Sequence, residues 1–234
     1  MAPIATKRSV KDGRTAERVE TAKSARILVV DDHPIVREGL VGIMSRTPDL
    51  SVCAQAETSF QALEAIGSAK PDLVVVDISL GERSGIDLIK DIKVRYPKVP
   101  VVVHSMHDES LYAERCLRAG AKGYVMKQEP PQRVLQAVRR VLQGEICLSE
   151  AMTKRLLHRF SDKPATSPLD LLTDREFQVL DLIGRGHPTR EVAHLLNLSC
   201  KTVQTHREHL KEKLNLKDAT SLVKYAVQWV GSEK

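Results

Sequence analysis

The sequence is poor in aromatic residues, with three Phe, four Tyr and one Trp in 234 residues. Leu, Val, Ile and Ala must therefore build most of its hydrophobic core. Its four cysteines are scattered and form no CxxC pair, which argues against a disulfide framework or a cysteine-based zinc site. The sequence shows no signal peptide and no apolar run near the roughly 20 residues of a membrane span. We therefore expect a cytoplasmic protein without membrane attachment.

The net charge of +6 is compatible with a polyanionic partner, but it is not concentrated in either half of the chain. Residues 24–145 carry equal numbers of acidic and basic side chains, and residues 170–234 are almost balanced. Composition alone therefore does not indicate nucleic-acid binding. That prediction must come from a motif.

Two histidine pairs have a spacing that suits metal binding on a helix. They are His104-x2-His107 and His206-x2-His209. Neither pair has a third ligand close by in the sequence, and three protein ligands are the usual minimum for zinc. The sequence therefore does not predict a metal site at either pair.

The chain divides into four parts by composition. Residues 1–23 are polar and charged, and we expect a disordered tail. Residues 24–145 alternate between strand and helix patterns, whereas 170–234 contain only helical ones. Between them, residues 146–169 combine a possible helix with the Pro- and Ser-containing stretch SDKPATSP, which is typical of a linker.

The alternating part predicts an α/β fold. Apolar runs that predict strands lie at 26–31, 50–56, 73–77, 99–105 and 123–126, and helical patterns follow at 34–45, 59–68, 84–96, 109–119 and 131–143. Repeated βα units with right-handed crossovers give a doubly wound, five-stranded parallel sheet covered by helices on both faces. Ligands of such sheets bind at the carboxyl ends of the strands.

Polar residues stand at the ends of four of these strands. Asp31 and Asp32 follow the first, Asp77 the third, Ser105 the fourth and Lys127 the fifth. Parallel strands end at the same rim, so three carboxylates, a hydroxyl and an ammonium group are expected to converge there. Clustered carboxylates suit Mg²⁺, which would relieve their mutual repulsion. A central carboxylate beside Mg²⁺ and a cation is suited to phosphoryl transfer, with Asp77 as the nucleophile.

At these residues the chain resembles a response-regulator receiver domain of flavodoxin-like fold. The resemblance covers about 25–145 and rests on VVDDHP, VVVDIS, VVVHSMHDE and AGAKGYVMK. It implies that Asp77 accepts a phosphoryl group from a sensor histidine kinase. It further implies the remaining roles: Asp31, Asp32, Asp77 and the Ser79 carbonyl for Mg²⁺, and Ser105, Tyr124 and Lys127 for binding and reporting the phosphoryl group.

The loop after Asp77 departs from that family. Its sequence is SLGERSG, with Leu80 and Gly81 where the family often has Met-Pro. A glycine makes the loop more pliable. The geometry of the Ser79 carbonyl is therefore less firmly predicted than that of the carboxylates.

The C-terminal part predicts a helix-turn-helix. In LTDREFQVLDLIGRG, Thr173 and Glu176 have the spacing of a capping box at the start of a helix. Residues 188–196 then predict a short helix, and Ser199 is a suitable N-cap for a longer helix over about 200–214. A short helix, a tight turn and a longer helix in this order are typical of DNA-binding motifs.

The longer helix has one apolar stripe and one polar face. Val203, Leu210 and Leu214 lie on the apolar side at ~100° per residue. The other side carries groups that can bind base edges or phosphates. The candidate DNA-binding residues are Lys201, Thr202, Gln204, Thr205, Arg207, Glu208 and Lys211.

This part resembles the LuxR/FixJ/NarL-type helix-turn-helix over about 170–232. The resemblance rests on LTDREFQVLDLIGRG, REVAHLLNLSCKTVQTHREHLKEKLNL and LVKYAVQWV. Pro188 stands where the family often has Ser, and Gln204 and Glu208 stand where some members have Lys. Because the last two are candidate base-reading positions, the DNA target is expected to differ from that of the lysine-bearing members.

Together the two halves resemble a NarL/FixJ-type response regulator. The resemblance implies that phosphorylation of Asp77 controls binding of a homodimer to double-stranded DNA, and that the protein is not an enzyme. Two alternatives remain open from the sequence. One is a DNA-binding regulator that does not depend on phosphorylation. The other is a Mg²⁺-dependent phosphohydrolase, for which the sequence offers neither a general acid beside Asp77 nor a substrate-binding cap.

Overall fold

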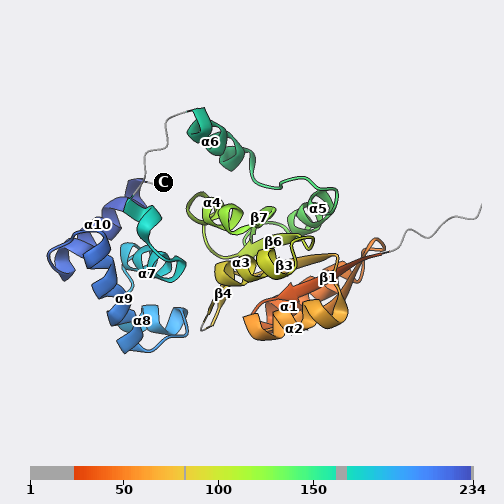
Figure 1. The fold of residues 1–234 in the computed structure, drawn as a ribbon, viewed down its shortest axis with the longest axis horizontal. Helices are drawn as coiled ribbons and strands as arrows, with labels where there is room; N and C mark the ends of the chain where they lie inside the picture. The colour runs from red at the N-terminus through yellow and green to blue at the C-terminus, as the bar shows by residue number, and fades with distance from the viewer. Residues whose placement is uncertain (1–23, 82, 162–167, 233–234) are drawn as a thin grey trace, which may run out of the picture.

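The structure of the protein is a computed structural model that describes residues 24–81, 83–161 and 168–232 (Figure 1). The N-terminal tail expected over 1–23 lies outside the described residues, as does part of the expected linker. An α/β part comes first and a helical part follows it. No described helix has the length and apolar character needed to cross a membrane.

The α/β part is built on a five-stranded sheet in which every neighbouring pair is parallel. The strand order is β2-β1-β3-β6-β7. This is the doubly wound arrangement that the sequence predicted, with each strand close to its expected position. The strands are β1 (Ala25–Val30), β2 (Leu50–Ala56), β3 (Leu73–Val76), β6 (Val101–Ser105) and β7 (Gly123–Met126).

Five helices cover the two faces of the sheet. They are α1 (Pro34–Met44), α2 (Ser59–Ala69), α3 (Gly85–Arg95), α4 (Glu109–Ala119) and α5 (Pro131–Leu142). Alternate residues of β1 face opposite sides. Ile27 and Val29 pack with residues of α1 and α5, whereas Leu28 and Val30 pack with α2, α3 and α4. Both faces are thus buried, which explains the continuous apolar runs in the strands.

A short antiparallel hairpin follows Asp77, and the sequence did not predict it. It consists of β4 (Ser79–Leu80) and β5 (Arg83–Ser84). Gly81 lies at its turn with a φ of 58°, a left-handed conformation that favours glycine. The Ser84 side chain then caps α3 by accepting a hydrogen bond from the Ile86 backbone. This hairpin carries Ser79 and projects toward the helical part (Figure 1).

The helical part contains the predicted helix-turn-helix. After α6 (Glu150–Ser161) and the 3-10 turn η1 (Pro168–Leu171) come α7 (Asp174–Gly184), α8 (Thr189–Leu195), α9 (Cys200–Lys213) and α10 (Ala219–Ser232). The Thr173–Glu176 capping box is formed, and Ser199 caps α9. Asn197, with a φ of 51°, allows the tight turn between α8 and α9.

Candidate functional site

The carboxyl ends of β1, β3 and β7 bring two aspartates and a lysine together. The Lys127 ammonium lies 2.7 Å from an Asp31 carboxylate oxygen and 2.8 Å from an Asp77 carboxylate oxygen. Asp31 is 1% exposed and Asp77 3% exposed, so the two acids are buried and share one cation. A buried cation offsets much of the cost of placing two carboxylates together. The convergence expected from the strand ends is therefore present in the fold.

Asp32 and its neighbour His33 complete the outer side of this acidic pocket. One donor atom from each of Asp31, Asp32, His33 and Asp77 lies within 4.8 Å of the others. The Asp77 Oδ1 atom is buried and has no hydrogen-bond partner among the described residues. A buried carboxylate oxygen without a partner, next to other oxygen ligands, fits a hard divalent cation such as Mg²⁺.

Burial and the neighbouring charges shift the proton affinities of this pocket. Burial raises the pKa of Asp77 to about 6, against the lowering effect of Lys127. Burial alone would lower the pKa of Lys127, but the Asp77 and Asp31 carboxylates outweigh it and raise that pKa. Lys127 is therefore charged at neutral pH. Asp77 holds its negative charge less firmly than an exposed aspartate, and a bound cation would favour the charged form.

Ser105 and Tyr124 both contact the loop that follows β6. The fully buried Ser105 hydroxyl accepts a hydrogen bond from the His107 backbone N–H at 3.3 Å. The Tyr124 hydroxyl donates to the His107 carbonyl at 2.9 Å, with the tyrosine 1% exposed. The Ser79 hydroxyl lies 3.1 Å from the His107 ring. Three residues with predicted roles thus meet at His107, for which the sequence predicted no role at this site.

Two further residues hold the acidic pocket in shape. The Arg37 guanidinium donates a hydrogen bond to the Asp31 carbonyl at 2.6 Å and also binds the Glu57 carboxylate. Gly85 packs so closely that an added Cβ would lie 1.9 Å from the Asp77 carbonyl oxygen. Neither residue was singled out from the sequence. From the sequence, an arginine on a helix such as Arg37 is expected to be solvated. Close backbone packing at Gly85 is indicated in the sequence only by the glycine.

The polar face of α9 is accessible. Lys201, Gln204, Thr205 and Glu208 are exposed, and the other candidate DNA-binding residues, Thr202, Arg207 and Lys211, are half-buried. Val203 and Leu210 are fully buried, as the helical spacing predicted. Glu208 accepts a hydrogen bond from the Gln204 amide at 2.7 Å and pairs with Lys211. Three of the side chains that could bind DNA therefore bind one another in this structure.

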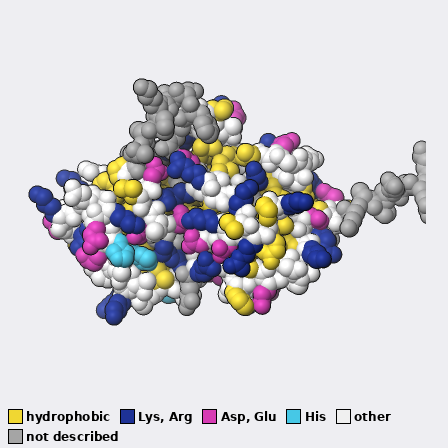
Figure 2. Space-filling model, in the orientation of Figure 1, with side chains coloured by type: hydrophobic (Ala, Val, Ile, Leu, Met, Phe, Trp, Pro, Cys, Tyr) yellow, Lys and Arg dark blue, Asp and Glu magenta, His cyan; other side chains and the backbone are white. Residues whose placement is uncertain are grey.

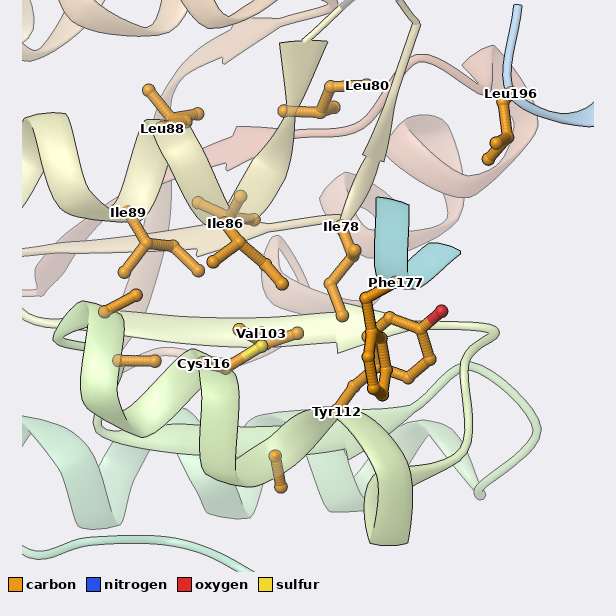
Figure 3. Packing of buried hydrophobic residues seen from close by; sticks show 14 of the residues in the cluster. Ile78, Leu80, Ile86, Leu88, Ile89, Val103, Tyr112, Cys116, Phe177 and Leu196 are labelled. Carbon is orange, nitrogen blue, oxygen red and sulfur yellow. The ribbon is translucent and has the colours of Figure 1, made fainter. Parts of the chain in front are cut away.

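The two parts of the molecule meet along α4 and α7. The Tyr112 hydroxyl of α4 donates to the Asp181 carboxylate of α7 at 3.2 Å, and both residues are fully buried. The rings of Tyr112 and Phe177 pack edge to face, with centroids 5.2 Å apart (Figure 3). The His107 ring stacks on Tyr112, with the ring centroids 4.3 Å apart. Burial raises the pKa of Tyr112 well above its ordinary value, so its hydroxyl remains a donor.

Charged groups surround this aromatic contact. Asp174 at the start of α7 binds Lys90 at 2.6 Å and Arg115 at 3.2 Å. The Arg115 guanidinium also lies over the Phe177 ring, 4.1 Å from its centroid. Arg175 donates a hydrogen bond to the Gly81 carbonyl at the hairpin turn. Basic side chains of the α/β part thus bind the acidic start of α7, and Figure 2 shows Lys and Arg gathered between the two parts.

Two family descriptions match the two parts of the chain. Residues 27–139 match the response regulator receiver domain. Residues 170–226 match the bacterial regulatory proteins of the luxR family. Each match falls on the part of the chain where the sequence resemblance was noted.

Relatives and solved structures span both parts. The oxygen regulatory protein NreC of Staphylococcus epidermidis is 33% identical over 212 residues, covering 87% of this chain and 97% of NreC. NreC of Staphylococcus haemolyticus is 35% identical over 211 residues, with the same shares of 87% and 97%. The RcsB response regulator of Salmonella typhimurium matches with a TM-score of 0.60 at 25% identity, covering 88% of this chain and 98% of RcsB.

A second RcsB structure, from Salmonella enterica serovar Typhimurium, is bound to a promoter in the presence of phosphomimetic BeF3⁻. It matches with a TM-score of 0.57 at 26% identity, covering 87% of this chain and 98% of that chain. The chain therefore belongs to the NarL/FixJ-type two-component response regulators, which join a receiver domain to a LuxR-type helix-turn-helix and control transcription by binding DNA.

Proposed function

We propose that Asp77 is the phosphoryl acceptor of this response regulator and that its phosphorylation controls DNA binding by α9. The observation that carries the proposal is the shared contact of Lys127 with Asp31 and Asp77 in one buried pocket, where the Asp77 Oδ1 has no hydrogen-bond partner within the described part of the chain. Of the two Asp77 carboxylate oxygens, one would bind Mg²⁺ and the other would attack phosphorus.

The chain's own residues hold the reacting groups. Asp31, Asp32 and Asp77 provide carboxylate oxygens for Mg²⁺, with the Ser79 carbonyl as a further ligand. When bound, Mg²⁺ neutralises charge on the phosphoryl oxygens. Lys127 places a second positive charge beside Asp77, and Ser105 offers a hydroxyl to the phosphoryl group. The phosphoryl donor is a sensor histidine kinase.

The contacts of His107 suggest how the pocket communicates with the helical part. Ser105 accepts a hydrogen bond from the His107 backbone, and the His107 ring stacks on Tyr112. A phosphoryl group on Asp77 adds about −1.5 to −2 charge and new acceptor oxygens. Reorientation of Ser105 to donate to these oxygens would weaken the hydrogen bond that it accepts from the His107 backbone. Movement of the His107 loop would then disturb the packing of Tyr112 on α7. The population in which the two parts are in contact would fall.

The released helical part binds double-stranded DNA as a homodimer in this proposal. Two copies of α9 would enter successive major grooves, and a two-fold symmetric dimer would recognise two half-sites. Lys201, Arg207 and Lys211 are assigned to phosphates. Thr202, Gln204, Thr205 and Glu208 are assigned to base edges. The promoter-bound RcsB structure supports this arrangement by similarity. Such a regulator acts in the cytoplasm, where the kinase donor and the DNA are found.

Two alternatives make different predictions. A phosphorylation-independent regulator would bind DNA equally with and without a phosphodonor. The complete pocket of Asp31, Asp77, Ser105 and Lys127 argues against it. A Mg²⁺-dependent phosphohydrolase would release phosphate over many turnovers without a kinase. A regulator that is not an enzyme would keep the phosphoryl group long enough to change DNA affinity.

A gel-shift titration tests the proposal. Genomic fragments bound by the protein are selected first, and their affinity is measured with Mg²⁺, with and without a small phosphodonor such as acetyl phosphate. We expect the phosphodonor to raise the affinity of the wild-type protein for its selected fragment. The Asp77→Ala variant should show no such response, and Glu64→Ala, an exposed acid on α2, should respond like the wild type. Equal responses in wild type and Asp77→Ala would overturn the proposal.

A further inference from the structure

A cluster of metal-binding side chains lies between α7 and α9, away from the acidic pocket. One ring nitrogen each of His206 and His209 and one carboxylate oxygen of Glu176 lie within 4.8 Å of one another. The sequence showed the histidine pair but no third ligand. Glu176 precedes the pair by 30 residues and reaches it through the packing of α7 on α9. We propose that these three side chains form a binding site for a divalent transition metal ion, Zn²⁺.

The burial and the contacts of the three side chains are compatible with their binding a metal ion. The His206 Nδ1 atom is buried and has no hydrogen-bond partner among the described residues. His206 is half-buried, and metals bind the neutral form of the imidazole ring. His209 is half-exposed, and its Nδ1 lies 3.6 Å from the Glu176 Oε1 atom. These are the imidazole and carboxylate donors that Zn²⁺ takes.

The other carboxylate oxygen of Glu176 is already held in place. Its Oε2 atom accepts a hydrogen bond from the Thr173 backbone at 2.8 Å and pairs with Lys213 at 2.7 Å. These contacts leave Oε1 facing His209 and fix the orientation of the carboxylate, as outer contacts of metal ligands commonly do. The Lys213 ammonium lies beside the site and would repel a bound cation. The negative charge of the Glu176 carboxylate offsets this repulsion.

The geometry requires only a small adjustment. Tetrahedral Zn²⁺ with bonds near 2.0–2.1 Å brings its ligand atoms to about 3.3 Å from one another. The exposed His209 ring can rotate to close the remaining distance, and water takes the fourth position. A bound ion would link α7 to α9, and with them the capping box to the candidate DNA-binding helix.

Cobalt absorption and zinc calorimetry on the untagged full-length protein test this site. Excess Mg²⁺ occupies the acidic pocket, so that Co²⁺ and Zn²⁺ report on nitrogen-containing sites. We expect one equivalent of Co²⁺ to give visible bands of imidazole ligation that Zn²⁺ abolishes. Loss of even an outer partner of a metal ligand costs about 10- to 100-fold in affinity. His209→Asn should therefore weaken Zn²⁺ binding by at least about 100-fold, and Zn²⁺ should raise the unfolding temperature of the wild type but not of this variant.

Two controls make the result decisive. His187 forms an i,i+4 pair with Glu191 at 3.2 Å, and the residues that the structure describes supply no third ligand there, so His187→Asn should bind Zn²⁺ like the wild type. Cys200→Ser tests the exposed thiol near the start of α9. The inference is overturned if no Co²⁺ bands appear, if His209→Asn retains them, or if only Cys200→Ser loses them. None of these readouts requires DNA binding or phosphorylation, so the outcome is independent of the proposed function.

Discussion

The Tyr112 hydroxyl donates a hydrogen bond to the Asp181 carboxylate, joining α4 of the receiver domain to α7 of the DNA-binding domain at 3.2 Å. Both side chains are fully buried, and Asp181 also binds Arg185 at 2.8 Å. The Tyr112 ring also stacks on the ring of His107, whose backbone hydrogen-bonds to Ser105 and Tyr124. The domain interface and the acidic pocket therefore share a short chain of contacts.

Tyr112→Phe should weaken the contact between the domains. It removes a buried hydrogen bond to a charged group, which is worth about 1.5–3 kcal/mol, while Asp181 keeps its pairing with Arg185. Hydrogen exchange followed by mass spectrometry should show faster exchange of amides in α7. Tyr96→Phe is the matched control, since that hydroxyl donates to the Leu63 carbonyl at 3.5 Å, within the receiver domain. Equal exchange of α7 amides in the two variants would show that the Tyr112 hydroxyl does not hold the domains together.

Gly85→Ala should damage the acidic pocket without touching any charged group. Its Cβ would fall 1.9 Å from the Asp77 carbonyl oxygen and 2.8 Å from the carbonyl carbon, so the backbone carrying Asp77 must move. We expect a loss of at least about 3 kcal/mol in the free energy of unfolding. Urea denaturation of the full-length protein measures it.

Gly39→Ala provides the comparison for that substitution. Gly39 lies in α1, and no atom of the described residues outside its own helix backbone and chain neighbours is within 4 Å of an added Cβ. Replacing a helical glycine there should stabilise the protein by about 0.5–1 kcal/mol. If both substitutions had similar small effects, the tight packing of Gly85 against Asp77 would be refuted.

Removal of divalent cations should make stability depend on the charge of Asp77. Its folded-state pKa of about 6 lies above the ordinary value, so the folded protein binds this proton more tightly than the unfolded chain does. The resulting contribution to the free energy of unfolding is complete below about pH 4 and is lost as the pH rises through 6. The difference corresponds to about 3 kcal/mol. Mg²⁺ should restore most of this loss, because it stabilises the charged carboxylate.

Two histidines change the stability of the protein in the opposite direction over the same pH range. Burial lowers the pKa values of His104 and His107 to about 4, so they cost stability as the pH falls from about 6.5 toward 4. The measurement is therefore the difference between wild type and Asp77→Asn, by urea denaturation in EDTA at several pH values. We expect Asp77→Asn to gain stability relative to wild type as the pH rises. A pH-independent difference would contradict the raised pKa.

Lys201→Ala should weaken DNA binding through the phosphates. Lys201 is exposed at the start of α9, and each lost phosphate contact reduces the slope of log K against log salt concentration by about 0.9. Fluorescence anisotropy over a range of salt concentrations measures that slope. Lys98→Ala, an exposed lysine of the receiver domain, should leave it unchanged. The same slope in Lys201→Ala and wild type would remove Lys201 from the DNA interface.

Much of the fold could be predicted because its signals are local. Each strand is a continuous apolar run, and the shared rim of a parallel sheet predicted that Asp31, Asp77 and Lys127 would meet. The capping box at Thr173 and the cap at Ser199 were likewise visible in short segments. The hairpin after Asp77 was missed because each of its strands has only two residues.

The contacts between distant surfaces could not be predicted in the same way. Tyr112 has the position of a core residue on a receiver helix, and an aspartate such as Asp181 on α7 is expected to be solvated. Neither segment contains a signal that predicts the contact between them. Glu176 was identified only as a capping residue. Its position beside His206 depends on how α7 packs against α9, which periodicity does not specify.

The site of phosphorylation tests the proposed role of Asp77 most directly. Full-length protein is incubated with Mg²⁺ and acetyl phosphate, and the modified residue is located by borohydride reduction and peptide mass spectrometry. We expect one phosphoryl group per chain, carried by the Asp77 carboxylate, and no labelling of Asp77→Ala. Labelling of the wild type at another residue, or undiminished labelling of Asp77→Ala, would contradict it.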